Sequence, residues 1–231
     1  MSYMWNPTYW IFALPALLLA FYAQWKVRST YSKYLQIRNA SGVTGAEAAR
    51  RLMQTAGFHV NIEATRGQLS DHYDPREKVL RLSREVAMRP SVASVAIVAH
   101  EMGHAQQDAQ AFALLRLRSG LVPVVNLTSW LGPILFIIGM VLNSYELAGL
   151  GVLAFAGAAV FALVTLPVEI NASRRGMRLL RNSGVLVDQE ELKGARSVLN
   201  AAALTYVAAL AQALSTLLYY VFLLGGFRRR D

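Results

Sequence analysis

Four long apolar segments constrain this chain more than any other feature. Residues 9–25, 121–142, 147–168 and 204–224 carry no charged side chain, and the first of these runs has aromatic residues at both ends. A helix needs roughly 20 mostly apolar residues to cross the hydrocarbon core of a bilayer. We therefore predict four transmembrane helices. The alternative, buried helices in a soluble core, is disfavoured because soluble cores seldom contain charge-free runs of this length.

The rest of the composition limits the metal ligands and the binding partners that this chain can have. The chain has 231 residues, no cysteine and only four histidines. A transition-metal site must therefore use imidazole, carboxylate or water ligands. The net charge of +9 comes from basic residues that lie beside apolar runs and form no recognisable nucleic-acid module. Anionic lipid is the expected electrostatic partner, and nucleic acid is not.

The apolar runs predict a mainly α membrane protein of five segments. These are an N-terminal transmembrane anchor (1–25), a cytoplasmic α+β domain (26–120), a transmembrane helical hairpin (121–168), a polar helical segment (169–203), and a C-terminal transmembrane helix with a basic tail (204–231). Thr44 and Glu47 have the spacing of a capping box, so a helix is expected to start there and end at Gly57. Short strands are expected near residues 58–63 and 79–82. A helix with Ser91 as its N-cap is expected at 91–109. Another is expected from Asp188, and it could run unbroken into the last span.

Basic residues flanking the spans predict the orientation. Most of them fall on one side, which the positive-inside rule makes cytoplasmic: Lys26, Arg28, Lys33, Arg116, Arg118, Arg174, Arg175, Arg178 and Arg181. Four full crossings would place Arg228, Arg229 and Arg230 outside, so either the last segment does not cross or the tail is an exception. We expect a multi-pass protein of the cell membrane, inner or plasma, with its active site facing the cytoplasm.

A metal-binding motif lies on the helix expected at 91–109. The residues His100-Glu101-Met102-Gly103-His104 form an HExxH sequence, typical of zincin-type helices, in which positions i and i+4 share one face. Both imidazoles can therefore bind one Zn²⁺ ion. Zinc lowers the pKa of a bound water to about 7. Glu101 would be the general base that takes the proton from that water.

A third ligand is required, and Glu169 is the best candidate. It stands at the end of a charge-free span, where an unpaired carboxylate would be costly and a metal ion would neutralise it. Pairing with a nearby arginine is the alternative. Glu146, His72 and Asp108 are further ligand candidates. Asp108, one turn beyond His104, better fits a role in orienting an imidazole. Ser173, one turn after Glu169, has the same potential role.

Several further stretches resemble one family. They are residues 69–75 (LSDHYDP), 99–105 around HExxH, 167–175 (PVEINASRR) and 201–209 (AAALTYVAA). Together they resemble the bacterial neutral zinc metallopeptidases of the membrane, which are gluzincin-like, and more distantly the heat-shock and CAAX-processing membrane metalloproteases. The resemblance covers nearly the whole chain and implies Glu169 as third ligand. The distant relatives have an ExxAD pattern, whereas this chain has Ser173 at the last position, and serine orients a histidine more weakly than a carboxylate does.

Four residues are candidates for stabilising the transition state. His72 and Tyr73 lie in a polar stretch before a strand. In similar metallopeptidases that strand lies beside the cleft and pairs with extended substrate, so either residue could donate a hydrogen bond there. The alternative is an ordinary turn with a solvated histidine. Arg174 and Arg175 could stabilise an oxyanion, although arginines just past a span often bind lipid phosphates instead.

The expected activity is zinc-dependent endopeptidase hydrolysis of membrane-bound or membrane-adjacent polypeptides. The main alternative is a catalytically silent membrane scaffold that keeps zinc for structure. Such a site normally has four protein ligands, whereas a catalytic site has three and an open position. A transporter that uses intramembrane charge is a third alternative, but the charge-free spans provide little for a substrate pathway.

Overall fold

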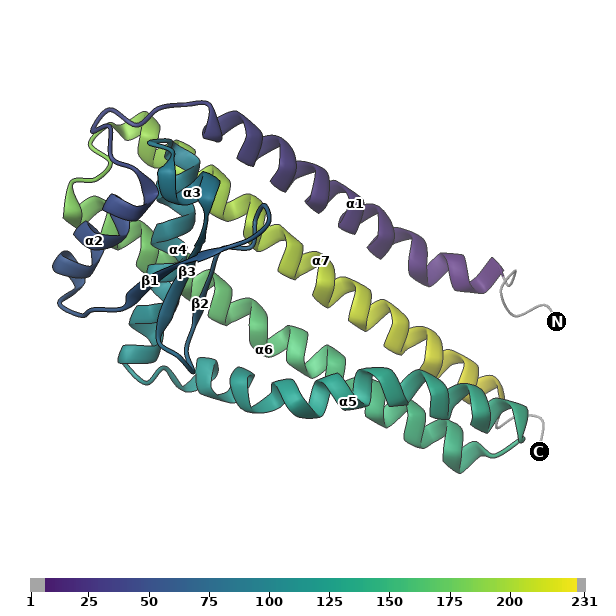
Figure 1. Ribbon diagram of the computed structural model, residues 1–231. Helices are drawn as coiled ribbons and strands as arrows, with labels where there is room; N and C mark the ends of the chain where they lie inside the picture. The colour runs from purple at the N-terminus through teal and green to yellow at the C-terminus, as the bar shows by residue number, and fades with distance from the viewer. Residues whose placement is uncertain (1–6, 228–231) are drawn as a thin grey trace. The chain divides into compact units, whose positions relative to one another are not determined.

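The computed structural model describes residues 7–227 and is mainly helical (Figure 1). The predicted basic tail, Arg228 to Arg230, lies outside the described residues. The elements in chain order are α1 (Pro7–Leu35), α2 (Gly45–Ala56), β1 (Asn61–Thr65), β2 (His72–Asp74), β3 (Val79–Ser83), α3 (Arg84–Met88), α4 (Val92–Ala109), α5 (Ala113–Val141), α6 (Tyr145–Ser183) and α7 (Gln189–Phe227).

Four helices, α1, α5, α6 and α7, are long and apolar enough to cross a membrane. Together with the small sheet they confirm the mainly helical class with four candidate spans and a small sheet-containing part. The chain divides into two compact units. One, which we call the apolar unit, comprises Met1–Ala23, Arg116–Leu166 and Thr205–Asp231, and the other, the site unit, comprises Gln24–Leu115 and Pro167–Leu204.

In the apolar unit, α5 and α6 form the predicted helical hairpin. A side chain at Gly139 would place its Cβ 2.3 Å from the Ala148 backbone nitrogen, and one at Gly151 would lie 2.4 Å from that of Phe136. Glycine at these positions therefore allows the two backbones to pack directly against each other. Ser215 in α7 donates a hydrogen bond to the Phe12 carbonyl in α1.

Two helices are longer than the spans that their apolar runs suggest. α7 begins just after Asp188 and continues without a break to Phe227, as expected. α6 likewise continues past the apolar run to Ser183. We expected Glu169 on a helix that follows the hairpin, but it lies within α6 itself, because residues 169–183 contain no glycine cap or proline that would end the helix.

The site unit contains a three-stranded sheet of order β1-β3-β2 (Figure 1). β1 pairs with β3 in parallel, and β2 pairs with β3 antiparallel. The predicted strand at 79–82 is confirmed, whereas β1 begins three residues later than the predicted strand at 58–63. β2 was not expected. α2 starts with the predicted capping box: Thr44 Oγ1 accepts from the Glu47 N–H, and the Glu47 carboxylate accepts from the Thr44 N–H.

The core of the site unit surrounds α4. Val95, Val98 and Met102 on this helix are fully buried together with Leu52 of α2 and Leu80 of β3. The predicted serine cap is present, since Ser91 Oγ accepts from the Ser94 N–H at 3.1 Å. The core thus fixes α4 on several sides, and side chains on its remaining faces are held in defined directions.

α4 also packs closely against the part of α6 that belongs to the site unit. A Cβ at Gly103 would lie 2.2 Å from the Ala172 carbonyl oxygen, and a Cβ at Gly176 would lie 2.4 Å from the Ala99 carbonyl oxygen. Only glycine permits backbone contact of this kind at both places. The HExxH residues of α4 are therefore brought next to Glu169 and Ser173 of α6.

Candidate active site

The two HExxH histidines extend from one face of α4. His100 and His104 are one turn apart, and their ring centroids are 4.8 Å apart. His104 is buried and His100 is nearly so. The helical spacing of four residues and the firm packing of α4 explain why both rings point to the same place.

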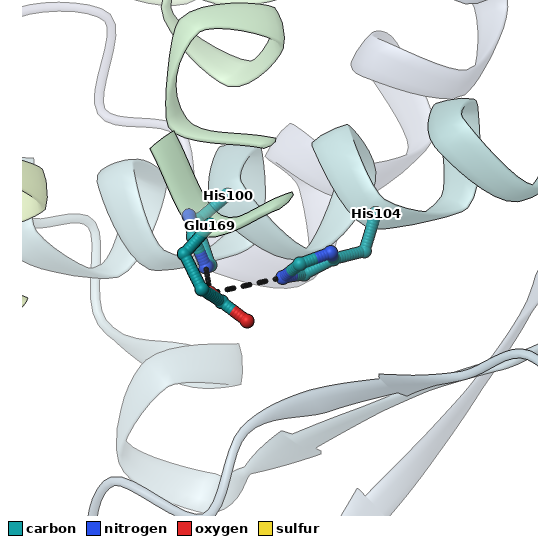
Figure 2. Close-up of side chains that lie close together, drawn as sticks. All are labelled: His100, His104 and Glu169. Carbon is teal, nitrogen blue, oxygen red and sulfur yellow. Dashed lines mark hydrogen bonds and ion pairs between the residues drawn. The ribbon is translucent and has the colours of Figure 1, made fainter. Parts of the chain in front are cut away.

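Glu169 meets these rings from α6 (Figure 2). Its Oε2 lies 3.2 Å from His100 Nε2 and 3.3 Å from His104 Nε2. Zinc bonds of about 2.0–2.1 Å at tetrahedral angles would hold two ligand atoms about 3.3 Å apart. The three candidate donor atoms lie within 4.8 Å of one another. Two imidazole nitrogens and a carboxylate oxygen are a donor set that suits zinc, so the residues fit the ion.

The far side of each imidazole also has a partner. Ser173 Oγ lies 3.1 Å from His100 Nδ1, and Gln107 Oε1 lies 3.0 Å from His104 Nδ1. Because Nδ1 of each ring is occupied by these contacts, Nε2 is directed toward Glu169. Ser173 thus has the contact that its predicted orienting role requires. Gln107 was not predicted, because a neutral amide in a helix gives no sequence signal for such a role.

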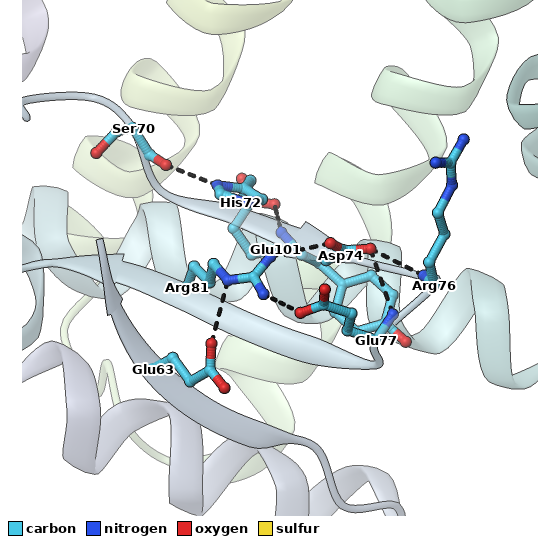
Figure 3. Close-up of polar contacts among 9 residues, drawn as sticks. Glu63, Ser70, His72, Asp74, Arg76, Glu77, Arg81 and Glu101 are labelled. Carbon is cyan, nitrogen blue, oxygen red and sulfur yellow. Dashed lines mark hydrogen bonds and ion pairs between the residues drawn. The ribbon is translucent and has the colours of Figure 1, made fainter. Parts of the chain in front are cut away.

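Glu101 faces a different element from its two histidine neighbours. Its Oε2 accepts a hydrogen bond of 2.9 Å from the backbone N–H of Tyr73 in β2 (Figure 3). Burial raises the pKa of Glu101 to about 7, while the electrostatic interaction with His100 and the Tyr73 hydrogen bond oppose that rise. A buried carboxyl group next to the first histidine is well placed to accept and return a proton.

Asp108 does not take the position expected for it. Its Oδ2 accepts a hydrogen bond of 2.9 Å from the Tyr73 hydroxyl, and the imidazole of His104 contacts Gln107 instead. Burial first, and then the Asp108 contact, raise the pKa of Tyr73, so its hydroxyl stays a donor. Tyr73 consequently joins β2 to α4 at two points, through its backbone N–H and its side chain.

The other three candidates for stabilising the transition state, His72, Arg174 and Arg175, differ in their exposure and their contacts. His72 is exposed on β2, with Nδ1 2.8 Å from the Ser70 carbonyl oxygen (Figure 3). Arg174 is exposed on α6. Arg175 donates to Asn171 at 2.7 Å and to Gln106 and Gln110 near the end of α4. All three partners of Arg175 lie outside the group formed by the two histidines and Glu169.

A network of side chains holds β2 in place. Asp71 accepts hydrogen bonds from the Ser83 N–H at 2.7 Å and from its hydroxyl at 3.2 Å. Asp74 accepts from Arg81 at 2.9 Å, and Arg81 also pairs with Glu63 and Glu77 (Figure 3). These bonds attach both ends of the short strand to β3, so the Tyr73 N–H is held opposite Glu101.

Known proteins resemble this chain over almost its whole length. The profile of the family "Putative neutral zinc metallopeptidase" matches residues 9–225. This chain belongs to that family. The "Putative membrane protease YugP" of Bacillus subtilis (strain 168) is 44% identical over 211 residues, which cover 91% of this chain and 93% of the relative. No solved structure matches the chain. Membership of a zinc peptidase family implies zinc as the cofactor and a polypeptide as the substrate.

Proposed function

We propose that this chain is a zinc-dependent endopeptidase of the gluzincin type that hydrolyses membrane-bound or membrane-adjacent proteins. The observation that carries the proposal is the convergence of His100 Nε2, His104 Nε2 and Glu169 Oε2, with Glu101 adjacent. Two histidines and a glutamate form a three-ligand set, which leaves the fourth zinc position to water or substrate. A purely structural zinc site would normally be closed by a fourth protein ligand.

Each residue of the site has a role in the proposed reaction. When bound, zinc supplies a Lewis acid that acidifies water and polarises the scissile carbonyl. Glu101 takes a proton from the attacking water and passes it to the leaving amine, and the Tyr73 N–H holds its carboxylate in place. Ser173 accepts from His100 Nδ1–H and so directs Nε2 inward. No covalent intermediate with the protein is involved.

A hydrogen-bond donor for the transition state is also proposed. We retain His72, because its side chain is exposed and it adjoins the residue that binds Glu101. Tyr73 is less suited, since its hydroxyl is already bonded to Asp108. Arg175 is occupied by its three partners, and exposed Arg174 is better suited to contact anionic lipid headgroups.

The location of the substrate follows from the position of Glu169 along the chain. It directly follows the charge-free run of residues 147–168 in α6, so the third ligand belongs at the end of a span. By the positive-inside rule, the basic residues that follow this run, with those after the first span, favour the cytoplasmic side of the cell membrane for this end. Substrate peptide bonds should therefore lie at or near that membrane face.

The proposal is tested with purified wild type and Glu101→Gln in detergent. Zinc content and cleavage of casein and of a membrane-protein substrate are measured for both. Equal zinc content with cleavage by the wild type alone supports the peptidase. Equal zinc content with no cleavage by either protein on any substrate would instead favour the zinc-binding scaffold.

A further inference from the structure

Gln107 is a buried polar residue next to the proposed zinc ligands. It lies on α4, three residues after His104, and its exposed fraction is 0%. Its amide makes three contacts: Oε1 with His104 Nδ1 at 3.0 Å, and Nε2 with the Val168 carbonyl oxygen at 2.9 Å and Asn171 Oδ1 at 3.0 Å. A fully buried amide is stable only when its donors and acceptor are paired, and here all three contacts are made within the protein.

These partners fix the orientation of the amide. A backbone carbonyl oxygen only accepts, so the group that faces Val168 must be the nitrogen of Gln107. Asn171 Oδ1 accepts from Arg175 Nε as well, which makes it a second acceptor beside the same nitrogen. The amide oxygen of Gln107 is therefore left to face His104. Since that oxygen can only accept, His104 Nδ1 carries the hydrogen, and Nε2 presents its lone pair.

The same side chain connects both helices that supply ligands. One end bonds to His104 on α4, and the other bonds to the carbonyl of Val168, the residue before Glu169 on α6. A carbonyl inside a helix already accepts from the N–H four residues later. The bond from Gln107 is therefore additional to the helix bond, and its function is to hold the two helices in register.

We propose that Gln107 is a positioning residue for the metal centre. It sets the tautomer of His104 and fixes the distance between His104 and Glu169, so that both donors meet one ion. This inference rests on the proposed zinc site. Removing a residue that hydrogen-bonds a metal ligand in this way typically weakens metal affinity by about 10- to 100-fold.

Three variants of the full chain in detergent separate this role from a structural one. Gln107→Met keeps the length and helix propensity of the side chain but removes all three bonds. Gln107→Glu keeps an oxygen that accepts from His104 but loses the donors. Gln106→Met is the matched control, because Gln106 is the adjacent residue and its side chain accepts a hydrogen bond from Arg175. Zinc affinity is measured by competition with a chelator, and the melting temperature of each apoprotein is measured in parallel.

We expect Gln107→Met to weaken zinc binding about 10- to 100-fold, Gln107→Glu to bind zinc more tightly than Gln107→Met, and Gln106→Met to match the wild type. Wild-type affinity in Gln107→Met would overturn the inference, whether or not its apoprotein melts earlier. Equal weakening in Gln107→Met and Gln106→Met would also overturn it. If the wild type itself binds no zinc, the proposed function fails, and the inference fails with it.

Discussion

Gly103→Ala is the substitution whose effect the structure defines most sharply. The added Cβ would lie 2.2 Å from the Ala172 carbonyl oxygen, 2.9 Å from its carbonyl carbon and 3.1 Å from its Cα. All three atoms belong to the backbone, so no side-chain rotation can relieve the contact. A carbon and a carbonyl oxygen normally approach no closer than about 3.3 Å. α4 and α6 must therefore separate locally by about 1 Å.

This separation should lower both the stability of the fold and the catalytic activity. Overpacking in a core typically costs about 1–3 kcal/mol, and alanine returns roughly 1 kcal/mol through its better helix propensity. We expect a net destabilisation of up to about 2 kcal/mol. The catalytic loss should be larger, because His100 and His104 would move away from Glu169. A displacement of about 1 Å can lower activity about 100-fold.

The assay compares kcat/KM for casein cleavage and the thermal midpoint in detergent. Gly120→Ala in α5 is the matched control, since a Cβ there would meet nothing within 4 Å. It should keep wild-type activity and should be as stable as the wild type or slightly more so. If Gly103→Ala cleaved casein at the wild-type rate and melted at the wild-type temperature, the close packing of α4 on α6 would be refuted as the device that assembles the site.

Three further predictions concern the surroundings of the ligands. Ser173→Ala should weaken zinc binding by up to about 10-fold. Ser173→Asp should bind zinc more tightly than Ser173→Ala, because a carboxylate orients the imidazole of His100 more strongly than a methyl group does. Competition with a chelator measures both affinities. Tyr73→Phe removes the hydrogen bond to Asp108 and should lower kcat more than it lowers the zinc content. Lower zinc content with an unchanged kcat per bound zinc would contradict this prediction. Removing zinc with a chelator should abolish cleavage and lower the thermal midpoint, both restored by added zinc, and an unchanged midpoint would argue against metal binding by the folded state.

The three residues of the proposed metal site could be predicted from sequence because each has a local signal. His100 and His104 have the i, i+4 spacing of a helix face, and Glu169 is a carboxylate at the end of a charge-free run. The structure brings these three together. Their meeting also depends on Gly103 and Gly176, whose sequence positions alone do not reveal that they face another backbone.

The residues around the ligands were harder to predict, and the geometry of α4 explains why. Positions 100, 104 and 107 follow the i, i+4, i+7 spacing, so Gln107 shares the face of the two histidines. Glu101 and Asp108 are also seven residues apart, and they lie together on a neighbouring face that meets Tyr73. The spacing of Asp108 from His104 suggested a contact with the imidazole, but Asp108 belongs with Glu101.

β2 was missed for a related reason. It has only three residues, too few for an alternating pattern, and tertiary hydrogen bonds from Asp71 and Asp74 hold it to β3. Short strands of this kind are set by their partners more than by their own propensities. The long helices, in contrast, could be predicted from their apolar runs. Their full lengths could not be read from these runs, because the polar ends of α6 and α7 extend beyond the charge-free segments.

The zinc K-edge absorption spectrum of the purified full chain tests the central claim most directly. The account predicts one zinc per chain, four-coordinate with nitrogen and oxygen ligands at about 2.0–2.1 Å, and multiple scattering from two imidazoles. Glu169→Gln should lose most of this zinc, whereas Glu101→Gln should keep it with the same two imidazoles. A wild-type spectrum with three or four imidazoles, or a protein that binds no zinc, would contradict the account.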